Sequence, residues 1–311
     1  MEEARQKLQK LHQNLSSVIR GKEDTIELLL VSLLSGGNVL LHDVPGVGKT
    51  TLAKSLAACL TATFHRLQFT PDLLPTDILG GDVYNPRDGE MHFRPGPVFA
   101  NILLADEINR ASPRTQSALL EAMSEGQVST SGGTIPLPRP FLLLATENPV
   151  EFQGTYALPE AQLDRFAMRL TLGYPDFEAE KQLVTDRLHG EPLAELEPCL
   201  NCQDIIALQE TVKQVKVEDS LLMYILELVR ATRQDERLVL GGSPRSILQL
   251  TRCAQGLAWF QGRDYVLPDD VKRLAVPVLA HRLVLDNQAS YAGEEASRIV
   301  QDILDRLAVP R

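Results

Sequence analysis

The sequence predicts an α/β fold, in which helices cover a mostly parallel sheet on both faces, followed by a smaller all-helical domain. Three observations lead to this prediction. Short apolar runs alternate with helical periodicity up to about residue 175, and only helical periodicity follows. The length of 311 residues is enough for about two domains. We therefore expect an α/β domain over residues 1–175 and a helical domain over residues 176–311.

The first elements are predicted as two helices, a strand and a third helix. Apolar residues recur at helical spacing over Leu8–Ile19, and a second helix is expected over Glu23–Leu34 because the glycines 36–37 then stop it. Asn38–His42 is typical of a short buried strand, and Thr50–Leu60 returns to helical spacing. Strand, turn and helix in this order open an α/β unit.

Further apolar runs complete the predicted sheet. They are Phe64–Phe69, Ile102–Ala105, Phe141–Thr146 and Met168–Leu172. A helix over Ser112–Ser124 separates two of them, with Ser112 as N-cap and Pro113 in the first turn. Two Gly-containing segments, Gly80–Gly96 and Gln127–Pro138, do not fit this alternation. The second indicates a hairpin around residues 131–133, and both are predicted as insertions into the sheet domain.

The C-terminal region shows only helical spacing, with no clear strand between the helices. The expected helices are Glu178–Leu188, Ile205–Val212, Ser220–Arg233, Ser246–Phe260, Val271–Arg282 and Glu294–Leu307.

Composition excludes several classes of protein. Hydrophobic residues make up 44% and charged residues 23%, which is typical of a globular chain and not of a disordered, collagenous or coiled-coil one. There are 31 basic and 41 acidic residues, so the net charge of −10 disfavours general nucleic-acid binding.

Cysteines and targeting signals are sparse. Four cysteines do not make a disulfide framework, and the pair Cys199–Cys202 lacks the second pair of a zinc site, so we interpret them as small apolar side chains. The N-terminus has no apolar signal segment, and the longest apolar run, Leu28–Leu34, is too short to span a membrane. We therefore expect a cytoplasmic protein without a membrane span.

The segment Pro45-Gly46-Val47-Gly48-Lys49-Thr50 follows a predicted strand and opens a helix, which is the context of a phosphate-binding loop. Glycines let backbone N–H groups face phosphate oxygens, Lys49 would reach the β- and γ-phosphates, and the Thr50 hydroxyl would hold Mg²⁺. The expected nucleotide contacts extend to Thr51. The general pattern has Gly where this chain has Asp43, which can also adopt left-handed backbone angles.

Two carboxylates follow a second predicted strand. Asp106 and Glu107 come directly after the apolar run 102–105. Ligands bind at the carboxyl ends of parallel strands, so Asp106 is expected to support Mg²⁺ and Glu107 to activate the attacking water. Asn148 follows another such strand and could hydrogen-bond that water, although an Asn before Pro149 is also a common turn residue.

Together these motifs resemble the MoxR family of AAA+ ATPases, from residue 19 to about residue 282. The matching stretches are Asp43–Thr50, Phe93–Pro97, Leu104–Ala111, Thr115–Met123, Ala145–Pro149, Gly154–Phe166 and Gly241–Arg245. The resemblance implies an AAA+ P-loop NTPase core with a helical lid domain, ATP and Mg²⁺ as cofactors, and a homo-oligomeric ring, commonly of six.

The resemblance also implies roles for residues outside the loop. Arg165 is expected to be an arginine finger that reaches the γ-phosphate held by the next subunit. Arg245 is expected to be the sensor-2 residue, in its own site or a neighbour's, and Ile19 to pack on the adenine ring. Arg110 could face the subunit junction or form an ordinary surface ion pair. The two inserted segments are expected to project from the ring and touch a client.

Three functions remain open at this point. The first is an ATP-driven remodelling or maturation factor that acts on protein clients with a von Willebrand factor A domain partner. The second is a DNA-dependent motor, which the net charge and the few cations around the 127–138 hairpin disfavour. The third is a nucleotide-gated scaffold with little hydrolysis, which the presence of Glu107, Asn148 and Arg165 disfavours.

Overall fold

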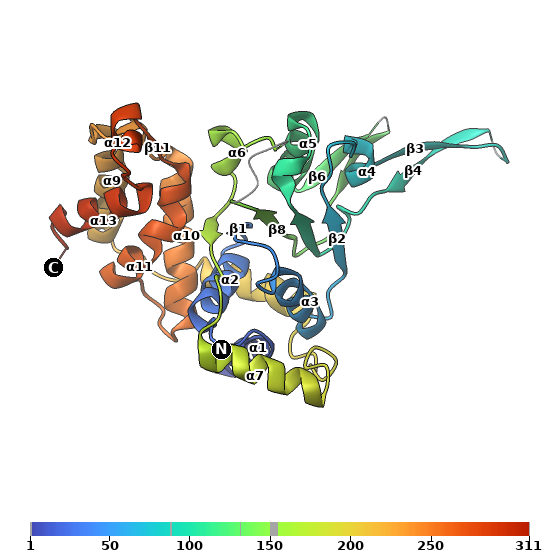
Figure 1. Cartoon of the computed structure of the whole chain (residues 1–311), viewed down its shortest axis with the longest axis horizontal. Coiled ribbons are helices and arrows are strands. Elements are labelled where there is room, and N and C mark those ends of the chain that lie inside the picture. Colours follow the sequence, from blue (N-terminus) through green and yellow to red (C-terminus); the bar gives the residue numbers. More distant parts are fainter. Residues whose placement is uncertain (1, 88, 131, 150–154, 311) are drawn as a thin grey trace.

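A five-stranded parallel sheet forms the centre of the molecule (Figure 1). The computed structural model describes residues 2–87, 89–130, 132–149 and 155–310. The strand order is β2-β5-β8-β1-β9. The strands are β1 (Val39–His42), β2 (Phe64–Gln68), β5 (Ile102–Asp106), β8 (Leu142–Glu147) and β9 (Met168–Leu170), which confirms the predicted sheet with ends shifted by one or two residues.

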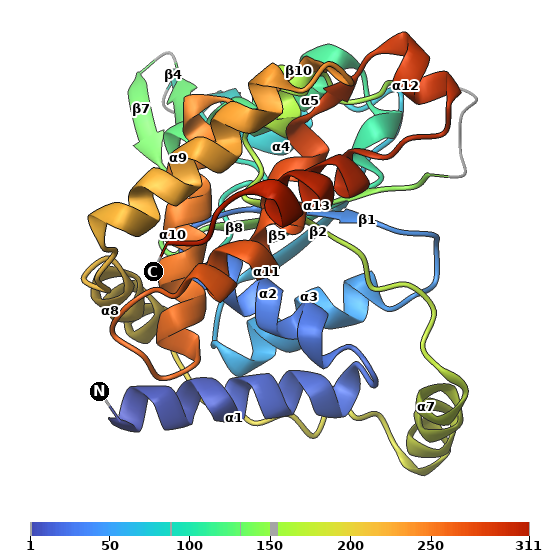
Figure 2. The same cartoon turned by 90° about the vertical axis from the view of Figure 1, so that its left-hand side faces the viewer.

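Helices cover both faces of this sheet because its three central strands are apolar on both sides. On β1, Leu41 packs in one hydrophobic cluster and the adjacent Leu40 in the other, as the two-residue period of a strand requires. One face is covered by α1 (Glu2–Val18), α2 (Glu23–Leu34) and α3 (Lys49–Cys59). On the other lie α4 (Pro75–Leu79) and α5 (Pro113–Glu125), as Figure 2 also shows.

The start of α5 confirms the predicted helix cap. The Ser112 hydroxyl accepts a hydrogen bond from the Thr115 N–H at 3.3 Å, and Pro113 occupies the first turn. The helix ends at Gly126 in the left-handed conformation. Only a 3₁₀ turn, Ile108–Arg110, separates this helix from β5, so the cap lies a few residues after the acidic residues 106–107.

The helices after residue 176 are α7 (Phe177–His189), α8 (Cys202–Val212), α9 (Asp219–Gln234), α10 (Pro244–Phe260), α11 (Pro268–Leu279), α12 (Asn287–Tyr291) and α13 (Ala296–Arg306). Of these, α8 to α11 and α13 share a hydrophobic core with the sheet domain. Buried Leu257 of α10 belongs to the same hydrophobic cluster as Leu29 of α2. Gly256 permits this close packing, since a Cβ there would lie 3.2 Å from the Val31 carbonyl oxygen.

Three details of this region were not predicted. A short antiparallel pair, β10 (Leu238–Leu240) with β11 (Val284–Leu285), interrupts the helices, so the expectation of an entirely helical region is wrong in this respect. The helix expected over residues 271–282 ends at Leu279 and continues as a 3₁₀ turn, Ala280–Arg282. Helix α12 was also missed, because a five-residue helix is too short to show a period.

Both insertions are β-hairpins. The first pairs β3 (Gly80–Asn85) with β4 (Glu90–Pro95) and projects far from the sheet (Figure 1). The second pairs β6 (Gln127–Thr130) with β7 (Gly133–Pro136), which confirms the predicted hairpin. Ser131, at its expected tip, and Gly154, the first residue of a matching stretch, lie outside the described residues.

All four cysteines are free, and Cys199 contacts Cys59 rather than Cys202. The Cys199 backbone N–H donates to the Cys59 carbonyl oxygen at 2.9 Å. The Cys199 thiol donates to the same carbonyl oxygen at 3.7 Å, and the Cys199 side chain lowers the pKa of Cys59. Cys199 therefore contacts a cysteine that is far away in sequence.

In the described part of the chain, no helix is long and apolar enough to cross a bilayer. The domain boundary near residue 175 stays a prediction. It falls between Leu170, the end of the last sheet strand, and Phe177, where α7 begins.

Truncating Leu257 should destabilise the fold, because its side chain is fully buried between the two parts of the chain. We expect Leu257→Ala to lower the free energy of unfolding by about 2–5 kcal/mol. The matched control, Leu248→Ala on the same helix, removes a side chain that is 61% exposed and should change it by less than about 0.5 kcal/mol. Urea titration measures both, and equal losses would contradict the shared core.

Candidate functional site

The phosphate-binding loop connects β1 to α3. Gly46 and Gly48 have φ angles of +88° and +98°, which side-chain-bearing residues rarely adopt, so these two positions require glycine. Helix α3 starts at Lys49, whose Nζ donates to the Asp43 carbonyl oxygen at 2.8 Å. Burial lowers the pKa of Lys49, while the carboxylates of residues 43, 106 and 107 oppose that shift. The Lys49 ammonium is thus hydrogen-bonded within the phosphate-binding loop.

Asp43, which replaces the Gly of the general loop pattern, makes structural hydrogen bonds. Its carboxylate is buried and accepts the backbone N–H groups of Leu172, at 2.6 Å, and Gly173, at 2.9 Å. A glycine could not make these bonds. The carboxylate therefore ties the start of the phosphate loop to the segment that leaves the last strand of the sheet.

Asp106 ends β5 and is almost fully buried. Its Oδ1 accepts the Thr146 hydroxyl at 2.7 Å, and its Oδ2 accepts Arg66 Nη2 at 2.7 Å. Thr146 comes from β8 and Arg66 from β2, the two strands on either side of β5. The carboxylate is thus held in place from both sides, at the carboxyl edge of the sheet.

Glu107 has a strained backbone, with φ of 58° and ψ of 50° in the left-handed region. Its N–H donates to the Thr146 hydroxyl at 2.8 Å, which holds this conformation. Its Oε2 accepts Gln68 Nε2 at 2.5 Å and lies 3.0 Å from Arg110 Nε. Of the two alternatives for Arg110, the structure contains the local ion pair.

Asn148 lies directly after β8 and is 5% exposed. Since β8 lies between β1 and β5, this residue is at the sheet edge between the phosphate loop and the acidic pair. The loop, Asp106, Glu107 and Asn148 therefore follow three adjacent parallel strands, which is the arrangement that the sequence predicted.

A cavity of about 760 Å³ opens beside the phosphate loop. Six of the expected nucleotide contacts line it: Ile19, Gly46, Val47, Gly48, Thr50 and Thr51. The other two, exposed Pro45 and buried Lys49, do not line the cavity. Another wall comes from the segment before α7 and from α7 itself, and it combines apolar residues such as Tyr174, Pro175 and Leu183 with the charged residues Glu180 and Arg187.

An ion pair helps to hold α7 over this cavity. Arg20, next to Ile19, donates from Nη2 to Asp186 Oδ2 at 2.9 Å. The phosphate loop matches the polyanionic end of a nucleotide, and the apolar lining residues Ile19 and Leu183 offer surface for a flat base.

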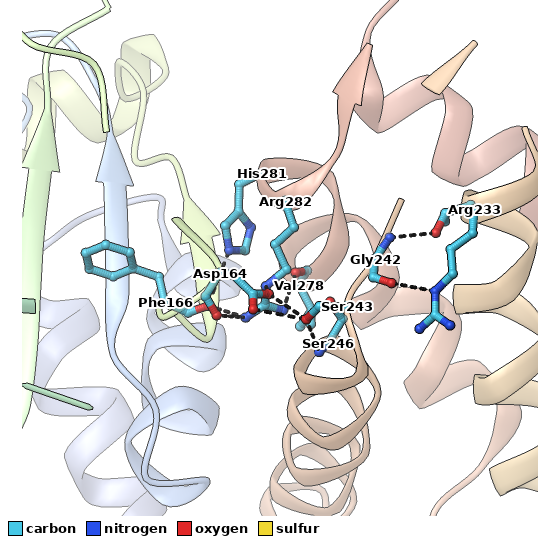
Figure 3. A network of polar contacts seen from close by, with 10 residues as sticks. Asp164, Phe166, Arg233, Gly242, Ser243, Ser246, Val278, His281 and Arg282 are labelled. Carbon is cyan, nitrogen blue, oxygen red and sulfur yellow. Dashed lines mark hydrogen bonds and ion pairs between the residues drawn. The ribbon is translucent and has the colours of Figure 1, made fainter. Parts of the chain in front are cut away.

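The two arginines expected to act on phosphate do not line this cavity. Arg165 follows α6 (Glu160–Leu163), and its Nη1 donates to the Leu120 carbonyl oxygen of α5 at 2.7 Å. Arg245 is exposed in the first turn of α10. Asp164 and Ser243, their close neighbours in sequence, join Arg282 in a polar network (Figure 3).

Sequence reasoning missed several residues that shape the site. They are Arg66, Gln68 and Thr146 around the acidic pair, Asp186 beside the cavity, and Asp164 and Arg282 at the network. The signal for Gln68 and Thr146 was available, because both lie at or near the carboxyl end of a predicted strand. The others depend on contacts between distant parts of the chain.

Comparisons with known proteins agree with this site. Residues 38–168 match the model of the ATPase family associated with various cellular activities (AAA), and residues 230–303 match an AAA lid domain. The sequence is 48% identical over 303 residues to the uncharacterized protein YeaC of Bacillus subtilis, with 97% of this chain and 95% of that protein covered.

Two further relatives carry informative names. Chaperone MoxR1 of Mycobacterium tuberculosis is 43% identical over 94% of this chain and 80% of its own length. Protein MoxR of Paracoccus denitrificans is 33% identical over 87% of this chain and 86% of its own length.

A solved structure of a provisionally named ATPase from Cytophaga hutchinsonii superposes with a TM-score of 0.92 at 38% identity, covering 100% of this chain and 98% of that one. The sheet with its phosphate loop, the helical lid and the relatives agree, and the chain belongs to the MoxR family of AAA+ ATPases.

Proposed function

We propose that this protein is a Mg²⁺-dependent ATPase that works as a chaperone-like remodelling or maturation factor on protein clients. The observation that carries the proposal is the convergence of the phosphate loop, the acidic pair and Asn148 at one edge of the sheet, where a cavity opens beside the loop. The relative named a chaperone supports the same class of activity.

The residues of the loop bind the polyphosphate. The backbone N–H groups of the Gly46–Gly48 turn and the start of α3 attract the phosphates, and Lys49 exchanges its bond to the Asp43 carbonyl for one to a phosphate oxygen. Ile19 and the Tyr174–Pro175 segment pack on the base.

Thr50 and Asp106 would hold the metal. A hydroxyl and a carboxylate are hard oxygen donors, so this pair fits Mg²⁺, which when bound neutralises charge on the β- and γ-phosphates. Asp106 can take this role after Arg66 releases one of its oxygens.

Glu107 acts as the general base, and Asn148 orients the attacking water. Glu107 must first leave Gln68 and Arg110, because its carboxylate oxygen is occupied by both in this structure. The strained backbone keeps the side chain at the sheet edge while it changes partners.

Arg165 and Arg245 act on the nucleotide of a neighbouring subunit in a homo-oligomeric ring, for which six is the expected number. Neither arginine lines the cavity of its own chain, and each lies within two residues of a member of the network in Figure 3, Asp164 or Ser243. A finger that neutralises γ-phosphate charge accelerates hydrolysis by about 10³–10⁵. Nucleotide-dependent movement about residues 174–176 then transmits the work.

The β3–β4 hairpin is the proposed contact with the client or with a von Willebrand factor A domain partner. It projects from the sheet and exposes Val83, Tyr84 and Met91, so its apolar surface is available. A cytoplasmic location is part of this proposal.

Glu107→Gln should remove hydrolysis and preserve binding, because it keeps the shape of the side chain and loses the base. We expect turnover to fall by about 10²–10⁴ with unchanged nucleotide affinity. Phosphate release and fluorescent-nucleotide titration measure the two quantities. The control Glu125→Gln alters an exposed carboxylate at the end of α5. Wild-type turnover in Glu107→Gln would mean that another group is the base.

Lys49→Ala and Arg165→Ala should each be inactive, the first because it cannot bind ATP and the second because it cannot lend a finger. Mixed together, they should regain part of the activity, since each restores the component that its neighbour lacks. Steady-state ATPase assays across mixing ratios measure the rescue. Strictly additive, near-zero rates at every ratio would argue against a shared site.

The Glu107→Gln protein should retain its partner when ATP is present. We expect affinity capture from cells of the source organism, followed by mass spectrometry, to identify a protein with a von Willebrand factor A domain. Tyr84→Ala should reduce this capture if the β3–β4 hairpin is the contact, and Lys49→Ala should abolish its ATP dependence. Recovery of single-stranded DNA instead would support the motor hypothesis.

A further inference from the structure

The candidate finger is attached to the lid of its own subunit through a buried arginine. Arg282 closes the 3₁₀ turn after α11 and is 4% exposed. Its Nη2 donates to the Phe166 carbonyl oxygen, and its Nε lies 3.2 Å from Asp164 Oδ1 (Figure 3). The residue between these two partners is Arg165.

The lid contacts the same segment a second time. The Ser243 hydroxyl, which caps α10, donates to the Asp164 carboxylate at 3.0 Å. His281 Nε2 lies 3.3 Å from the Phe166 carbonyl oxygen. The two contacts come from α10 and from the turn after α11, so they fix both the position and the tilt of the lid against residues 164–166.

Arg282 is also anchored on the lid side. Its Nη1 donates to the Val278 carbonyl oxygen of α11 at 2.8 Å. One planar guanidinium therefore joins a lid helix to the backbone and the carboxylate of the finger segment. Burial lowers the pKa of Arg282 to about 10, and the Asp164 carboxylate opposes this shift.

We propose that Arg282 and Asp164 are positioning residues that make the placement of the Arg165 finger depend on the lid of the subunit that lends it. The inference rests on the proposed function, since it requires Arg165 to act in a neighbouring site. A lid that moves when its own subunit binds or releases nucleotide carries residues 164–166 with it. The nucleotide state of one subunit thus changes the hydrolysis rate in the next.

The same connection reaches the second arginine. Ser243 begins the helix that carries Arg245 two residues later, and the charge of Arg245 acts on Arg282. Arg165 and Arg245 are therefore displaced together, as one unit, when the lid turns.

The test uses the rescue between Lys49→Ala and Arg165→Ala subunits, in which the Lys49→Ala subunit lends the finger. Arg282→Lys is added to one of the two mutant subunits at a time. Lysine is chosen because it keeps the positive charge but lacks the planar guanidinium that joins Phe166, Asp164 and Val278. On the lending subunit it should lower the rescued rate by about 10²-fold, as a small displacement of a catalytic group does. On the Arg165→Ala subunit it should leave the rescued rate unchanged.

Controls separate positioning from folding. Asp164→Asn should repeat the asymmetry in a milder form, and Arg252→Lys, an exposed position on α10, should have no effect in either subunit. Nucleotide affinity and melting temperature are measured for every variant. Equal loss from both placements, or loss from neither, would overturn the inference while the proposed function stands. Absence of the original rescue would remove the shared site, and the inference with it.

Discussion

The buried carboxylate of Asp43 holds the nucleotide site together. It accepts two N–H groups from the segment after β9, while the carbonyl of the same residue accepts the Lys49 ammonium. Charge-assisted bonds of this kind are strong when they are sheltered from water. Asp43 consequently holds the phosphate loop, Lys49 and the segment that leads to α7. Any motion of α7 over the cavity therefore starts from this residue.

The sheet and the catalytic edge could be predicted from sequence because their signals are local. Strands such as 102–106 and 142–147 are continuous apolar runs, and their polar ends follow immediately. The same logic fails for Arg282 and Asp164, which lie 118 residues apart and meet only when the lid packs on the core. The pairing of β10 with β11 could not be predicted for a related reason. Strands of three and two residues are too short to show a hydrophobic period. The Asp43 side chain was interpreted through its backbone angles, whereas its carboxylate proved to be the important group.

Glu107 and Arg165 share a property that links the two halves of the mechanism. Each is held by partners of its own chain, Glu107 by Gln68 and Arg110, and Arg165 by the Leu120 carbonyl. A subunit in this arrangement is stable but poorly disposed to hydrolyse ATP. In the proposed mechanism, contact with a neighbour and with nucleotide would replace these bonds, and hydrolysis would then depend on assembly.

The β3–β4 hairpin is fixed only at its base. A Cβ at Gly80 would lie 2.2 Å from the Arg94 carbonyl oxygen, and one at Gly96 would lie 2.3 Å from that of Ile78, so these two glycines allow no replacement without backbone movement. Near the distal end, a Cβ at Gly89 would meet no atom within 4 Å, and lengthening a surface loop costs little free energy. If the hairpin is the client contact, as proposed, sequence changes at its outer end would alter the choice of client and leave the ATPase core unchanged.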